Sequence, residues 1–158
     1  MPRPVELTYS RVFPYSVDVA YAWLTDYQDD DPSRTDRVVT RRSVVERHAD
    51  RVILDADVTT IARWKGRVEV RLFPPDRWEA RPVGSRSTVF TYRLEPHPAG
   101  ARLTVIYTMG VRKPWKRAVA LVTRPFIARR IARMWDGFAF AMERELGPAK
   151  RVAVARVG

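Results

Sequence analysis

The sequence predicts an α+β fold in which a curved antiparallel sheet of about seven strands wraps around a long C-terminal helix. Three observations lead to it. A short strand and a short helix come first. From residue 38 onward, apolar residues recur at every second position for about seventy residues, which is the period of a β-strand. From Pro114 onward, they recur at the spacing of an α-helix.

The N-terminal segment predicts one strand and one helix. Apolar and polar residues alternate over Val5–Tyr9, as in a half-buried strand. Ser16 is placed to cap a helix, and Asp18 lies in the first turn, where the helix dipole favours a carboxylate. Three consecutive aspartates followed by Pro32 end this helix, since like charges and a proline both oppose its continuation. A further helical turn is expected over 32–37.

The middle of the chain predicts a meander of antiparallel strands. A weaker run over 38–47 precedes the main alternation, and Val52, Leu54 and Ala56 begin a face that continues to Trp64. Short turn signals divide the rest into strands. The expected turns lie at Lys65–Gly66, Pro74–Asp76, Val83–Ser85 and Glu95–Gly100.

The C-terminal segment predicts two helices. Its first apolar stripe, which begins at Trp115, points in the direction that Arg129, Arg130 and Arg133 take further along one straight helix. A break at Pro125 removes this conflict. We therefore expect a short helix over about 115–123 and a long one over about 125–146, with 147–158 a frayed tail of a single domain that spans 1–158.

Composition narrows the classes of function. The chain of 158 residues has no cysteine, which excludes a disulfide framework and a cysteine zinc site. It contains no apolar run near the ~20 residues needed to cross a bilayer, and its N-terminus lacks the apolar core of a signal peptide. A cytoplasmic location is the simplest interpretation.

Positive charge is in excess, with 29 Lys and Arg against 18 Asp and Glu. The charge is spread over every segment, which favours a solvated basic surface over a specific nucleic-acid site. The sharpest basic segment combines Lys113, Lys116 and Arg117 with Trp115, a pattern suited to peripheral contact with an anionic membrane. The alternative is the solvated face of a helix near a pocket mouth.

Two segments carry a resemblance to a known family. The opening VFPYSVDVAYAWLTDYQ resembles the first strand and helix of the START-like superfamily (SRPBCC), also called the Bet v 1-like or helix-grip fold. The closing RPFIARRIARMWDGFAFAMEREL is similar to its C-terminal helix. The polyketide cyclase/dehydrase-like and lipid-transfer branches are the nearest relatives that the resemblance suggests. It implies an apolar ligand held between sheet and helix.

The physical argument leads to the same expectation, because one helix cannot fill a sheet of this size and the remaining space forms a pocket. Its expected lining consists of large apolar side chains from strands and helix: Trp64, Trp78, Phe90, Tyr92, Tyr107, Met109, Trp135, Phe138 and Met142. The expected function is binding of a small apolar or amphipathic molecule (a lipid, isoprenoid or polyketide-like compound) without chemistry. The alternatives are a cyclase or dehydratase that uses the same pocket, and a basic nucleic-acid binder.

Few residues are candidates for chemistry. Asp55 and Asp57 share one strand face and could form an acid–base pair, but arginines on the neighbouring strand favour exposed ion pairs. His48 and His97 fall in expected turns, so neither a metal site nor a histidine-based triad is predicted. No phosphate loop or nucleophile elbow is present, and no cofactor is expected. Three further side chains could polarise a carbonyl in the pocket: Arg63, Arg93 and Tyr107.

Overall fold

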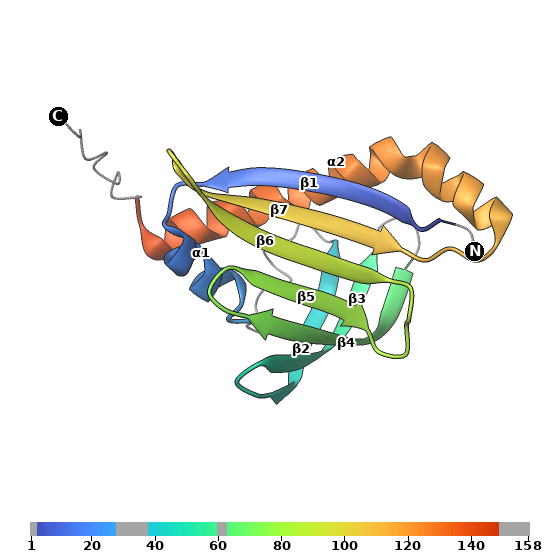
Figure 1. The fold of residues 1–158 in the computed structure, drawn as a ribbon, viewed down its shortest axis with the longest axis horizontal. Coiled ribbons are helices and arrows are strands. Elements are labelled where there is room, and N and C mark those ends of the chain that lie inside the picture. Colours follow the sequence, from blue (N-terminus) through green and yellow to red (C-terminus); the bar gives the residue numbers. More distant parts are fainter. Residues whose placement is uncertain (1–2, 28–37, 60–62, 149–158) are drawn as a thin grey trace.

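The computed structural model describes residues 3–27, 38–59 and 63–148. Within these ranges, seven antiparallel strands form one open sheet in the order β1-β7-β6-β5-β4-β3-β2, accompanied by two helices (Figure 1). The predicted α+β class and strand number are confirmed. The elements are β1 (Val5–Phe13), α1 (Val17–Leu24), β2 (Val39–Arg47), β3 (Arg51–Thr59), β4 (Arg63–Phe73), β5 (Arg77–Pro82), β6 (Val89–His97), β7 (Gly100–Met109) and α2 (Pro114–Leu146).

The sheet is a meander from β2 to β7, to which β1 is added by pairing with β7. The strand pairing brings the predicted apolar faces together on one side of the sheet. One row of directly paired residues crosses six strands and ends at Val52 on β3. Its members are Leu7, Tyr107, Phe90, Ala80, Val70 and Val52. Paired residues share a face, so this row defines the inner face of the sheet, toward α2.

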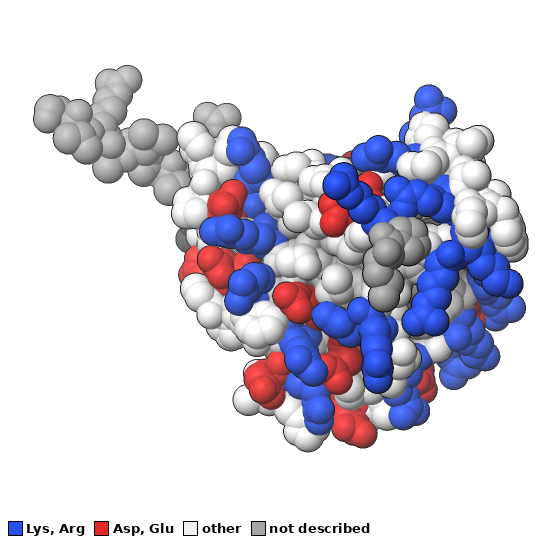
Figure 2. Space-filling view, turned by 45° about the vertical axis from the view of Figure 1, so that its right-hand side comes forward, with Lys and Arg blue, Asp and Glu red and all other residues white. Residues whose placement is uncertain are grey.

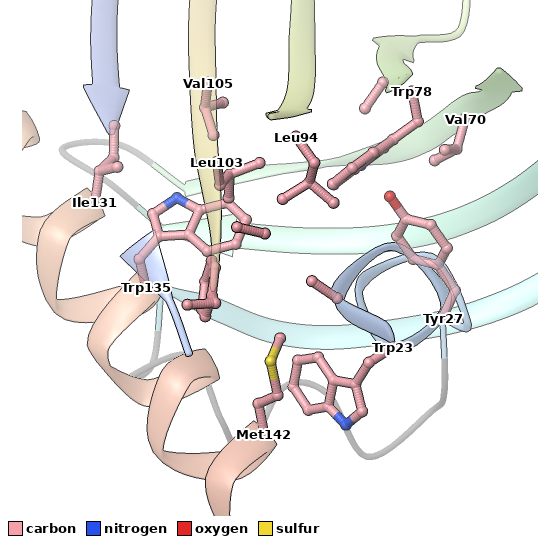
Figure 3. Close-up of a cluster of buried hydrophobic side chains, with 14 of the residues drawn as sticks. Trp23, Tyr27, Val70, Trp78, Leu94, Leu103, Val105, Ile131, Trp135 and Met142 are labelled. Carbon is pink, nitrogen blue, oxygen red and sulfur yellow. The ribbon is translucent and has the colours of Figure 1, made fainter. Parts of the chain in front are cut away.

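The core lies between the inner face and the two helices (Figure 3). Trp135 of α2 is its centre, because its ring stacks on Tyr9 at 6.1 Å and meets Phe13 edge-on at 6.4 Å. Trp23 of α1 meets Phe138 of α2 at 6.2 Å. These contacts fix both helices against the sheet through large aromatic surfaces.

The expected turn at Lys65–Gly66 is wrong, because both residues lie inside β4. Lys65 pairs with Asp57 and Gly66 pairs with Ala56 on β3. The glycine has a packing role instead: a Cβ atom added to Gly66 would lie 2.7 Å from a carbon of the Trp64 ring. Glycine inside a strand often marks such a close approach, which sequence alone cannot separate from a turn.

The expected break at Pro125 is also wrong, because α2 is one helix of 33 residues with Pro125 inside it. The two apolar stripes can point in different directions on one straight helix because only the second stripe packs on the sheet, whereas the first is exposed to solvent. Trp115 and Phe126 of the first stripe are exposed, whereas Ile131 and Trp135 of the second are buried. A proline removes one hydrogen bond but need not end a helix that packing holds further along.

Three other expectations concern the chain ends and loops. Ser16 occupies the N-cap position of α1 as predicted, although its side chain makes no cap hydrogen bond. The expected turn at 32–37 and the tail from 149 onward lie outside the described residues. That 1–158 forms a single domain stays a prediction. Among the described residues, no helix is apolar enough over a sufficient length to cross a membrane.

Candidate functional site

The inner face of the sheet has two unlike ends. At one end β1 finishes, β7 begins and α1 lies nearby; we call this the closed end. At the other end β1 begins, β4 begins and β7 finishes just before α2; we call this the open end. The antiparallel pairing places these strand termini together, so each end is formed by several strands.

The closed end is solid. Trp78, Leu94 and Leu103 are at most 1% exposed, and Met142 of α2 is fully buried against the same cluster. The Trp78 ring stacks on Tyr92 with centroids 4.9 Å apart and meets Tyr21 of α1 edge-on at 5.7 Å. Side chains this fully buried pack against one another as in an ordinary core.

The open end is incompletely covered. Trp64 is 39% exposed although it shares the inner face with Gly66 and with buried Ala56. Its ring lies along its own strand over Gly66, where any larger residue would displace it. Phe90 and Met109 are only half-buried on the same face. An exposed apolar surface that faces inward is typical of a site that a ligand completes.

Two tyrosines bring hydroxyl groups to the boundary between the ends. The Trp135 Nε1–H donates a hydrogen bond of 2.9 Å to the Tyr107 hydroxyl oxygen. Burial raises the pKa of Tyr107 well above its ordinary value, and burial raises the pKa of Tyr92 to about 12. Both phenols are therefore neutral near pH 7 and can donate hydrogen bonds, but they cannot serve as bases.

Arg42 is a candidate site residue that the sequence pattern did not indicate. It pairs with Ala56 and therefore points to the inner face from β2. Its guanidinium carbon lies 5.1 Å from the centroid of the Tyr27 ring, and its charge opposes the rise in the pKa of Tyr92. Val44 lies two residues later on the same face and could have indicated that Arg42 points inward. The many charged residues in this edge strand obscured the alternation of apolar and polar residues.

Of the three proposed carbonyl-polarising residues, only Tyr107 is at the inner face. Arg63 binds the Asp57 carboxylate on the outer face, with 2.9 Å between Nε and Oδ1. Hydrogen bonds from Arg63 hold the pKa of Asp57 below its usual value. Arg93 also lies on the outer face and is 3.5 Å from Glu95.

The paired aspartates form ion pairs, as expected, but they differ in burial. Asp55 is exposed and accepts a 3.1 Å hydrogen bond from Arg67, its partner across β3 and β4. Asp57 is only 5% exposed, so the expectation of an exposed ion pair is wrong for it. His48 lies 3.6 Å from Glu46, and His97 ends β6. No group of metal-ligating side chains occurs within the part of the chain that the structure describes.

Six of the nine expected lining residues form one connected cluster. Tyr92 lies 6.2 Å from Trp135, Trp135 lies 5.3 Å from Phe138, and Phe90 lies 5.2 Å from Tyr107. Trp78 joins through Tyr92, and Tyr107 joins through Trp135. Met142 lies in the same buried core as this set. The other two, Trp64 and Met109, lie apart from it at the open end.

Neither of two surface clefts among the described residues is lined by the nine expected residues. One, of about 290 Å³, lies between β1 and the last turns of α2, beside Arg11 and Asp136. The other, of about 560 Å³, lies where β7 leads into α2, beside Val111 and Pro114. The second cleft therefore adjoins the open end.

A sheet that grips a long C-terminal helix in this way defines the helix-grip class of folds. A scan against protein-family models and a search of curated proteins both find no match. Solved structures do match. Protein TTHA0849 of Thermus thermophilus superposes with a TM-score of 0.74 at 13% identity, over 89% of this chain and 99% of that one.

Two further matches are named as aromatase/cyclases. The aromatase/cyclase Zhui from a Streptomyces species has a TM-score of 0.69 at 12% identity, over 95% of this chain and 99% of its own. The di-domain aromatase/cyclase StfQ from the steffimycin biosynthetic pathway has a TM-score of 0.67 at 21% identity, over 91% of this chain and 52% of its own. These matches, at 12–21% identity, confirm the helix-grip fold that the two segments suggested.

Proposed function

We propose that this protein binds a small apolar or amphipathic molecule, such as a lipid, isoprenoid or polyketide-like compound, at the open end of the inner face. The observation that carries this proposal is the Trp64 ring, which faces inward over Gly66 and is nevertheless 39% exposed. Leaving this much aromatic surface in water has a cost that a bound apolar ligand removes.

The surrounding residues favour a ligand that has one polar part. Trp64, Phe90 and Met109 offer apolar contact, whereas Tyr107 and Arg42 bring a hydroxyl group and a cation to the same face. The Tyr107 oxygen accepts from Trp135, so its own O–H is the group available for donation to a ligand oxygen. A ligand with a carbonyl or hydroxyl group at one end matches this arrangement.

Titration with the dye anilinonaphthalene sulfonate tests the proposal. We expect the wild-type protein to bind the dye with increased fluorescence, and Trp64→Ala to weaken binding about fivefold or more through lost apolar contact. Trp115→Ala is the matched control, because Trp115 is exposed on α2 and is not part of the inner face. Absence of dye binding, or equal weakening by both variants, would contradict the proposal. Native mass spectrometry of the purified protein would identify a retained ligand.

A second candidate function is a cyclase or dehydratase that works in the same site. It is favoured by Arg42 and Tyr107, because a cation and a neutral phenol on one inner face could polarise a substrate carbonyl and position it for ring closure. Incubation with a poly-β-ketone mimic tests it. Formation of a cyclised product that is lost in Arg42→Gln, with dye binding retained, would support catalysis, and an unchanged mimic would leave binding as the function.

A further inference from the structure

The first half of α2 presents an apolar stripe to solvent. Trp115 is 61% exposed, Val122 is 78% exposed and Phe126 is 54% exposed, with Val119 between them. At about 100° per residue, these four side chains lie within about 60° of one another and extend over about 17 Å of helix. Such a stripe on an isolated helix surface indicates a partner.

The surroundings of this stripe are positively charged. The segment 111–135 contains eight Lys or Arg and no Asp or Glu, in a chain whose net charge is +11. Arg129 and Arg133 continue the direction of the stripe, and Lys116 flanks it with Nζ 5.6 Å from the centroid of the Trp115 ring. In Figure 2, Lys and Arg side chains border the end of the molecule where α2 begins.

The stripe also lies beside the candidate ligand site. The helix starts five residues after β7 ends at Met109, and its first turns extend past the ends of the strands (Figure 1). The 560 Å³ cleft at this junction is lined by Arg3, Val111, Arg112, Pro114 and Arg117. Arg117 donates a hydrogen bond to the carbonyl of Arg3, which ties the helix to the chain just before β1.

We propose that the first half of α2 docks on the surface of an anionic phospholipid bilayer, with the stripe in the interface and the cations against the headgroups. Apolar side chains flanked by basic ones are the pattern that binds such surfaces. A second copy of the chain is a poorer occupant, because its identical cations would repel the first. Docking in this orientation directs the open end toward the bilayer, so that a ligand can pass between them; this last step rests on the proposed function.

Vesicle flotation tests the docking. The wild-type protein is expected to float with vesicles that contain phosphatidylglycerol and to remain behind with vesicles of phosphatidylcholine alone. Raised salt is expected to weaken the interaction, since it screens the contacts between cations and headgroups. Brominated lipids are expected to quench part of the tryptophan fluorescence, and Trp115→Phe is expected to abolish that part.

Matched variants test whether vesicle binding depends on this stripe or on exposed apolar and basic side chains in general. The double variant Trp115→Ala/Phe126→Ala is expected to weaken vesicle binding about tenfold or more. Its control is Phe140→Ala/Leu146→Ala, which removes two exposed apolar side chains from the other end of the same helix and is expected to leave binding unchanged. Arg129→Gln/Arg133→Gln is expected to weaken binding, in contrast to Arg81→Gln/Arg86→Gln on exposed positions of other elements. Circular dichroism verifies that each variant is folded.

Four outcomes would overturn the docking proposal. The first three are absence of binding to phosphatidylglycerol vesicles, equal loss in the control variants, and concentration-dependent dimers that disappear in Trp115→Ala/Phe126→Ala. Binding to DNA that exceeds vesicle binding and ignores the apolar substitutions would also contradict it. The part of the dye binding that Trp64→Ala weakens and Trp115→Ala leaves unchanged reports on the ligand site, so a protein that binds vesicles but lacks this part refutes only the proposed function.

Discussion

The two ends of the inner face differ in what covers them. At the closed end, Trp78 is 1% exposed because Tyr92 stacks on it and Tyr21 of α1 meets its edge. At the open end, Trp64 has its own Gly66 beneath it and remains 39% exposed. The same residue type on the same sheet face therefore has two environments, since one ring completes the core and the other stays partly in contact with solvent.

The largest expected effect compares these two tryptophans. Trp78→Ala is expected to lower the free energy of unfolding by about 3–5 kcal/mol, because it leaves a cavity in a packed core. Trp64→Ala is expected to lower it by less, about 1–2 kcal/mol, because its ring is already partly hydrated. Urea denaturation measures both values. Similar losses in the two variants would remove the distinction between the ends.

Alkaline pH gives the next effect. The folded-state pKa of Tyr92 is raised to about 12, whereas the unfolded value is about 10. Because the unfolded chain loses the proton first, this contribution to stability is complete below about pH 10 and is lost as pH rises toward 12. The expected slope is about 1.4 kcal/mol per pH unit for each such tyrosine.

Tyr92→Phe checks this alkaline dependence. Urea denaturation at several pH values in this range is expected to show a shallower decline in the variant than in the wild type, because one buried phenol no longer titrates. Tyr107 follows the same rule, since burial also raises its pKa. If the free energy of unfolding declined equally with pH in Tyr92→Phe and in the wild type, the Tyr92 hydroxyl group would be exposed to water and the prediction would be wrong.

A smaller effect concerns the boundary between the ends. Tyr107→Phe removes the acceptor of the Trp135 indole N–H and is expected to cost about 1–2 kcal/mol of unfolding free energy. Tyr92→Phe is the comparison at neutral pH, and we expect it to lower the free energy of unfolding by less than Tyr107→Phe does. A shift of the Trp135 indole proton resonance in Tyr107→Phe alone would verify the bond, and equal costs would contradict it.

The smallest expected effect on stability comes from a substitution that tests the position of the Trp64 ring at the open end. Gly66→Ala adds a Cβ 2.7 Å from the Trp64 ring, so the ring must move from its place on the strand. We expect a change of about 1 kcal/mol or less in stability, with dye binding weakened about threefold or more. Lys65→Ala on the outer face is the control. Unchanged dye binding in Gly66→Ala would exclude this ring position from the ligand site.

Much of the fold could be predicted from the chain because its patterns are local. The period-two alternation indicated the meander, and the faces it assigned around Leu54 and Trp64 are those that the pairing brings inward. Fold class and strand number are confirmed on this basis. The cytoplasmic location and the frayed tail stay predictions.

Other properties depended on contacts between distant segments. Pro125 and Gly66 were interpreted as a break and a turn, although each lies inside a regular element. In both cases a strong local tendency was overridden by neighbours that are remote in sequence, and such packing cannot be read from propensity. The inward direction of Arg42 was missed for a related reason, since only the pairing of β2 with β3 shows it.

By itself, the sequence determined the alternation that makes a sheet, the apolar stripes of the last helix and the strong positive charge around Trp115, because side-chain period and charge are properties of neighbouring residues. Which aromatic rings are covered and which stay exposed follows from how the helices pack on the sheet. Burial depends on what another segment places over a residue, so Trp78 and Trp64 acquire different roles when α1 and α2 pack unevenly along the sheet.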